Sequence, residues 1–155
     1  MGRSHKQVAV IPYRVQAGHL EIALVSKSNG KGWTVPKGSL ETGEGGCDAA
    51  GREAEEEAGL LGELTRRPIG RYRYSKQDDR YEVRVYVMRV TIVREAWLEA
   101  AHRRRRWMAV EEAVKRLRPE LHSLVHETVR IVRSSTRYKH GPAAAHRTAS
   151  PAGLW

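Results

Sequence analysis

The chain has 155 residues, which suits one domain of about 100 to 200 residues and leaves little room for a second. Hydrophobic residues make up 40% and charged residues 30%, so a core can form and a fully disordered chain is excluded. A formal net charge of +10, from 28 Lys and Arg against 18 Asp and Glu, predicts an anionic partner. No stretch is long and apolar enough to predict a membrane span, and the single cysteine, Cys47, favours a cytoplasmic location.

The first half of the chain alternates short β-rich segments with loops. Residues 7–15 and 20–26 predict two strands joined by a hairpin turn, and residues 33–36 predict a short extended piece because Pro36 disfavours helix before it. A Gly-rich loop is expected over residues 37–46. Residues 48–58 predict a helix that ends at Gly59, since glycine is favoured just after a helix C-terminus.

The second half predicts two further strands and two helices. Residues 64–74 predict a strand interrupted at Pro68 and Gly70, and residues 81–93 give the clearest strand because apolar residues alternate along it. After a variable stretch over residues 94–106, we expect a short helix over residues 110–117.

A longer helix is expected to begin at Pro119 and to end near residues 133–135, because its apolar residues recur at helical spacing. Beyond it the composition shifts to Ala, Pro, Gly, His and Ser. We therefore expect one domain over residues 1–135 and a flexible tail over residues 136–155, with Trp155 as the anchor of that tail.

Acidic residues concentrate in residues 38–63, which hold eight Asp and Glu residues against Arg52 alone. This segment carries a charge of −7 and the rest of the chain +17. On a helix, Glu53, Glu56 and Glu57 share one face and Glu55 points to solvent. The alternative is a solvated acidic face, but such a face normally interleaves Lys or Arg. Clustered carboxylates repel one another, and a hard divalent cation such as Mg²⁺ or Mn²⁺ would relieve that repulsion.

The segment from Gly38 to Leu60 resembles the Nudix box, whose pattern is G-x5-E-x7-R-E-U-x-E-E-x-G-U. Every fixed position matches, and the one soft departure is Ala54, where the family often has a larger aliphatic residue. Segments 33–38 and 105–113 resemble the diadenosine polyphosphate and diphosphoinositol polyphosphate hydrolase branch of the family. The resemblance implies an α/β fold, the Nudix α/β/α sandwich, in which a mixed β-sheet lies between the box helix and a C-terminal helix.

The resemblance also implies roles for the box residues. The implied ligands of Mg²⁺ or Mn²⁺ are Gly38 through its carbonyl, Glu44 directly or through water, Glu53, Glu56 and Glu57. Arg52 would orient the glutamates through fork-shaped hydrogen bonds, a role in which Lys is a poor substitute. Glu53 or Glu57 is the candidate general base, and Glu99, Glu120 and Glu127 are less favoured alternatives.

Four basic residues are candidates for substrate binding: Lys37, Arg84, Arg104 and Arg105. The alternative for Lys37 is an ordinary surface lysine. Arg84 could instead pair with Glu82 or with a box glutamate. The run from Arg103 to Arg106 would be either a phosphate clamp or a solvated charge run.

These features favour a metal-dependent pyrophosphohydrolase whose partner is a polyanionic small molecule, a diadenosine polyphosphate or a diphosphoinositol polyphosphate. The alternative among enzymes is a nucleoside triphosphate or RNA 5′-end pyrophosphohydrolase. The alternative from another class is a non-catalytic nucleotide-binding or nucleic-acid-binding module, which the +10 charge suggests. The acidic segment disfavours that module, because phosphates avoid carboxylates unless a cation stands between them. A membrane partner is not expected.

Overall fold

The computed structural model describes residues 2–139, with side chains through residue 135. The strands are β1 (Ser4–Gln16), β2 (His19–Ser26), β3 (Trp33–Thr34), β4 (Lys37–Ser39), β5 (Leu60–Leu64), β6 (Gly70–Lys76), β7 (Asp79–Val93) and β8 (Arg105–Ala109). The helices are α1 (Gly46–Ala58), α2 (Val110–Arg116) and α3 (His122–Lys139), and a 3-10 turn, η1 (Pro119–Leu121), precedes α3.

The strands form one mixed sheet with the central order β3-β2-β1-β7-β5. β1 and β7 run parallel, whereas the other strand pairs are antiparallel. β4 pairs with β1, β6 with β7, and β8 with β2. The mixed sheet implied by the family resemblance is therefore confirmed.

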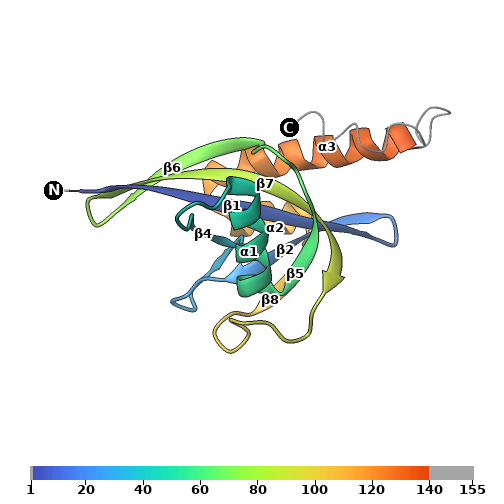
Figure 1. The fold of residues 1–155 in the computed structure, drawn as a ribbon. Helices are drawn as coiled ribbons and strands as arrows, with labels where there is room; N and C mark the ends of the chain where they lie inside the picture. The colour runs from blue at the N-terminus through green and yellow to red at the C-terminus, as the bar shows by residue number, and fades with distance from the viewer. Residues whose placement is uncertain (1, 140–155) are drawn as a thin grey trace.

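The two faces of the sheet bury separate apolar clusters. On one face Val8 and Met88 pack against Ala50 and Ala54 of α1, and small alanine side chains let this helix lie close to the strands. On the other face, strand residues such as Val85 pack with residues of α2, η1 and α3. The two helical layers lie on different sides of the sheet (Figure 1). The predicted α/β/α sandwich is thus confirmed.

Three sequence-based boundaries in the strands were wrong. The strand expected over residues 64–74 is two strands, β5 and β6, because the long β7 pairs with each of them at a different part of its length. β8 lies partly in the stretch expected to be variable, where pairing with β2 holds arginine-rich sequence in a strand. The expected Gly-rich loop begins with β4, which pairs with the edge of β1 at residues 7–9.

The helices agree more closely with expectation. α1 begins at Gly46, two residues before the expected start, and Gly59 ends it in the left-handed conformation, with φ of 66°. α3 continues to Lys139, beyond the expected end at residues 133–135. The rest of the expected tail, including Trp155, lies outside the described residues, so its flexibility stays a prediction.

Within residues 2–139, no helix is long and apolar enough to cross a membrane. The cytoplasmic location inferred from the sequence stays a prediction.

Candidate active site

The acidic face of α1 lies against the short strand β4. Glu53 and Glu57 are only 7% and 5% exposed, although both are carboxylates. A Cβ atom on Gly38 would collide with the carboxylate of Glu53, so a larger residue at this position would displace that carboxylate from its place beside β4. Glu55, expected to point to solvent, is partly exposed, with 45% of its side-chain surface accessible, and it pairs with Arg94 at 3.1 Å.

Arg52 lies among the carboxylates of the box and contacts three of them. Its Nε and Nη2 donate to the two oxygens of Glu44 at 2.8 and 2.9 Å. Its Nη1 donates to Glu53 at 3.0 Å and lies 3.5 Å from Glu56. Hydrogen bonding to Arg52 lowers the pKa of Glu44 to about 2, so this carboxylate stays ionised. One guanidinium therefore fixes the positions of three glutamates.

The two buried glutamates have perturbed acidities. Burial raises the pKa of Glu57 to about 8, although the Lys37 backbone N–H donates to its Oε1 at 3.1 Å and Arg103 lies 3.6 Å from its Oε2. Burial also raises the pKa of Glu53, which Arg52 opposes. Removing a carboxylate from water disfavours its charged form, so these two groups need either a proton or a compensating cation.

A cleft of about 520 Å³ opens beside Glu57. Its basic lining residues are Lys27, Lys37, Lys76, Arg103 and Arg118. Glu57 is the one acidic residue among those that line it, and Trp33 and Tyr74 supply aromatic walls. Such a cleft attracts polyanions because several cations face one small space.

Tyr74 organises two of these cations. The ammonium of Lys37 donates to the Tyr74 hydroxyl at 3.1 Å, and the guanidinium of Arg118 lies 4.8 Å from the ring centroid. The hydroxyl in turn donates to Gln7 at 2.8 Å. The pKa of Lys37 is lowered to about 8, because its ammonium is buried and lies near the positive charge of Arg118.

The four candidates for substrate binding lie in different places. Lys37 lines the cleft, whereas Arg84 lines a smaller crevice with Glu44 and pairs loosely with Glu82 at 3.8 Å. Arg104 lies over the Trp33 ring at 5.1 Å. Arg105 donates to the backbone carbonyls of Ala58 and Arg94 at 2.6 and 2.8 Å, and these contacts tie β8 to the end of α1.

Sequence reasoning did not single out four of the five basic residues of the cleft, namely Lys27, Lys76, Arg103 and Arg118. Arg103 belongs to the arginine run but was not chosen from it, and its proximity to Glu57 comes from the fold. Lys76 and Arg118 come from β6 and from the link between α2 and η1. No local pattern marks them, because they reach the cleft only when distant segments pack together.

The box residues fit a hard divalent cation by donor chemistry. Carboxylate oxygens of Glu53, Glu56 and Glu57 lie on one helix beside Gly38, and oxygen donors suit Mg²⁺ and Mn²⁺. Among the described residues, however, no group of three or more His, Cys, Asp or Glu side chains is arranged so that it could hold a metal ion. The Arg52 guanidinium holds the place between Glu53 and Glu56.

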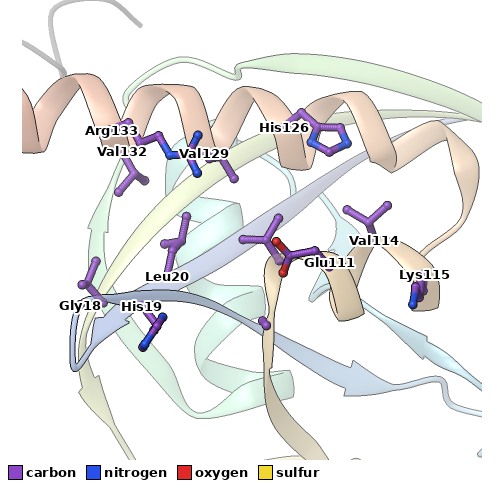
Figure 2. Close-up of a pocket in the computed structure, with 13 residues that line it drawn as sticks. Gly18, His19, Leu20, Glu111, Val114, Lys115, His126, Val129, Val132 and Arg133 are labelled. Atoms are coloured by element: carbon purple, nitrogen blue, oxygen red, sulfur yellow. The ribbon is translucent and has the colours of Figure 1, made fainter.

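A larger hollow of about 1130 Å³ lies elsewhere, between α3, α2 and the β1–β2 hairpin. Its lining includes Leu20, Val114, Val129 and Val132, and also His19, Glu111, Lys115, His126 and Arg133 (Figure 2). No box residue lines it. Its lining therefore combines apolar side chains with charged ones.

A family model described as NUDIX domain matches residues 3–128. The sandwich, the buried box glutamates and this match agree with one another. The chain belongs to the Nudix hydrolase family.

Two relatives are 35% and 39% identical to this chain over the aligned residues. Nudix hydrolase 4 of Arabidopsis thaliana is 35% identical over 116 residues, which cover 68% of this chain and 56% of the relative. Diphosphoinositol polyphosphate phosphohydrolase 2 of Rattus norvegicus is 39% identical over 109 residues, which cover 68% of this chain and 58% of the relative. The chain thus spans between half and two thirds of the length of these relatives.

A solved structure shares the fold. The crystal structure of a C. elegans Ap4A hydrolase binary complex superposes with a TM-score of 0.66 at 24% sequence identity. The match covers 84% of this chain and 98% of that chain, so nearly the whole of that protein has the same architecture.

Proposed function

We propose that this chain hydrolyses a phosphoanhydride bond in a diadenosine polyphosphate or a diphosphoinositol polyphosphate, with Mg²⁺ or Mn²⁺ as cofactor. The observation that carries the proposal is a buried carboxylate, Glu57, that faces a cleft whose other charged lining residues are all cations. A carboxylate can activate water, and the cations can neutralise a polyphosphate.

Metal binding is assigned to the box. Glu53, Glu56, Glu57 and the Gly38 carbonyl would hold the ion, and Glu44 would support it through Arg52 or through water. A divalent ion bound there would acidify water and offset the negative charge of the phosphates. Arg52 keeps the glutamates oriented through its hydrogen bonds, the role that outer-shell partners have in metal sites.

Glu57 is our first candidate for the general base, and Glu53 the second. In the metal-free protein, burial raises the pKa of Glu57 to about 8, so this carboxylate binds a proton more readily than an exposed glutamate does. Its Oε1 accepts from the Lys37 N–H and its Oε2 faces Arg103, so the side chain is held at the edge of the cleft.

The cations of the cleft support the substrate class. Lys37, Lys76 and Arg118 would contact phosphates that do not react, and Trp33 or Tyr74 would pack against an organic group. The names of the relatives, diphosphoinositol polyphosphate phosphohydrolase and Ap4A hydrolase, agree with a substrate of many phosphates. A nucleoside triphosphate or RNA 5′-end pyrophosphohydrolase is the alternative among enzymes.

The deciding experiment is a substrate panel. Diadenosine tetra- to hexaphosphate, diphosphoinositol pentakisphosphate, nucleoside triphosphates and 5′-triphosphorylated RNA would be incubated with Mg²⁺ or Mn²⁺, and the products would be resolved. We expect the highest kcat/KM for one of the first two classes, with loss of turnover in Glu57→Gln. If only nucleoside triphosphates or RNA were hydrolysed, the proposed substrate class would be wrong, and the alternative pyrophosphohydrolase would be the function. No turnover of any substrate with either metal would favour a non-catalytic binding module.

A further inference from the structure

One exposed part of the sheet carries an array of cations outside the cleft. It lies where β6, β7 and the start of β1 extend past α1 (Figure 1). The side chains that share this face are, by strand, Arg71, Arg73 and Ser75 on β6, Arg80, Glu82 and Arg84 on β7, and Ser4, Lys6 and Val8 on β1. We call these nine residues the cationic face.

The register fixes which side chains are neighbours. Arg71 is opposite Arg84, and Arg73 is opposite Glu82, which is in turn opposite Lys6. Paired residues on adjacent strands point to the same side of a sheet. Tyr86 and Met88, which follow on β7 with the same alternation, pack under α1, so the cationic face is on the α1 side of the sheet.

The charge of this face is far from balanced. Glu82 is its one acid among five Arg and Lys residues, and it lies 3.2 to 3.8 Å from Arg71, Arg73 and Arg84. Those three arginines are 54 to 69% exposed, so their guanidinium groups remain accessible. Among residues 2–135, whose side chains the structure describes, no carboxylate lies within salt-bridge distance of Lys6 or Arg80. One carboxylate can neutralise only one of the five cations.

The cationic face adjoins the box. Val8 lies between Gly38 of β4 and Arg84 of β7 in the register of the sheet. With strands about 4.8 Å apart, Arg84 is two strands, or roughly 10 Å, from Gly38, and Arg71 one strand further. A crevice of about 230 Å³, lined by Lys6 and Arg84 on one side and by Leu40 and Glu44 on the other, lies along this path.

We propose that the cationic face binds the sugar-phosphate backbone of single-stranded nucleic acid. The face has charged groups but no exposed apolar side chain, since Val8 is buried and the other uncharged members are serines. A protein interface needs an apolar core, and a peripheral membrane site needs side chains that insert into lipid. A phosphate backbone needs only cations and hydrogen-bond donors.

The extent of the face argues for a polymer. Alternate residues of a strand are about 6.7 Å apart, so Arg80 and Arg84 are separated by roughly 13 Å. The phosphates of a nucleoside triphosphate are bridged by single oxygens, and they cannot reach from the box across two further strands. A strand of several nucleotides can span the array. This surface goes beyond the proposed hydrolysis, and binding to it does not require cleavage.

The test is fluorescence anisotropy with a 12-nucleotide, 5′-hydroxyl oligouridylate in 50 mM NaCl without divalent metal. This probe has no phosphoanhydride, so the result is independent of the proposed activity. In Arg71→Gln/Arg73→Gln we expect Kd to rise at least fivefold. The slope of log Kobs against log salt should become shallower by about 1.4, since each contact with a single strand contributes about 0.7.

The matched control is Arg66→Gln/Arg67→Gln, which removes two exposed arginines from the β5–β6 connection. We expect less than a twofold change in its Kd. A second test pair, Lys6→Gln/Arg80→Gln, samples the other two strands and should weaken binding like the first. Circular dichroism would verify that all three variants are folded.

Three results would overturn the proposal. Wild-type protein that does not bind the oligonucleotide would do so directly. Equal weakening in the control and in both test pairs would assign the effect to net charge rather than to this face. Tighter binding to phosphatidylserine vesicles than to RNA, lost in the test pairs, would assign the face to a membrane surface.

Discussion

Arg52 holds Glu44 with two hydrogen bonds, at 2.8 and 2.9 Å, and uses its remaining terminal nitrogen for Glu53 at 3.0 Å. The planar guanidinium makes this possible, because its donors point in fixed and different directions. A lysine ammonium at this position could not bridge the two carboxylates in the same way. Arg52 therefore couples the box loop, which carries Glu44, to the acidic face of α1.

We predict that Arg52→Lys raises the metal concentration needed for half-maximal activity by on the order of 10-fold or more, because outer-shell partners orient the ligands. The measurement is activity against Mn²⁺ concentration at saturating substrate. Arg130→Lys, in an exposed pair on α3, is the control for an arginine-to-lysine change and should behave like wild type. An unchanged metal requirement in Arg52→Lys would contradict the proposed role of Arg52 in orienting the glutamates.

The second prediction concerns the metal-binding glutamates. Glu56→Gln and Glu57→Gln should each lower kcat by at least about 10²-fold at saturating metal. Each change removes a negative charge from the carboxylates proposed to hold the metal, and the metal would stabilise the charge that develops in the transition state. Glu55→Gln is the control because the side chain of this neighbour is 45% exposed and pairs with Arg94. Near wild-type turnover in both Glu56→Gln and Glu57→Gln would refute the site assignment.

The sequence allowed the box to be predicted because its residues are close together along the chain. Glu53, Glu56 and Glu57 lie on one helix, so helical spacing alone brings them to one face. Gly59 ends this helix as expected, because the left-handed conformation there favours glycine. In these cases a local rule was sufficient.

Long-range packing could not be predicted in the same way. Arg118 reaches Tyr74 only because η1 packs against β6, and nothing in the sequence around Pro119 indicates that contact. The arginines of β8 looked like a charge run, since a period-2 pattern is hidden when charged residues occupy both faces. Pairing with β2 fixes which side of the sheet each of these arginine side chains faces, and it places the Arg105 side chain at the end of α1.

The third prediction is a pH dependence of stability in the metal-free protein. Burial raises the pKa of folded Glu57 from its usual 4.5 to about 8. Between these values the folded protein keeps a proton that the unfolded chain releases, so raising the pH removes stability. One such group contributes a slope of up to about 1.4 kcal/mol per pH unit. Urea unfolding from pH 5 to 8 should show a shallower fall in Glu57→Gln than in wild type.

Divalent metal should oppose this loss. Mg²⁺ or Mn²⁺ binds the ionised carboxylates of the folded protein, so millimolar metal should raise Tm, and more at pH 8 than at pH 6. Changing Glu44, Glu53, Glu56 and Glu57 together to Gln should remove the response. A wild-type Tm indifferent to metal, in a protein that is active with it, would contradict the assignment of these carboxylates to the metal site.

The last prediction separates the two roles that arginines take around the cleft. Arg105 donates to Ala58 and Arg94 carbonyls, so Arg105→Gln should lower the free energy of unfolding by about 1 to 3 kcal/mol, the cost of losing hydrogen bonds from a charged donor. The KM of Arg105→Gln should change little.

Arg118 lines the cleft over Tyr74, so Arg118→Gln should raise KM, and more for substrates with five or six phosphates than for a nucleoside triphosphate. The clamp hypothesis for the arginine run instead expects that KM pattern from Arg104→Ala/Arg105→Ala. Urea unfolding and KM measured on all three variants distinguish the structural role of Arg105 from the clamp hypothesis. Equal KM changes for every substrate length, lost at high salt, would indicate long-range steering, because exposed charges are screened beyond about 8 Å at physiological ionic strength.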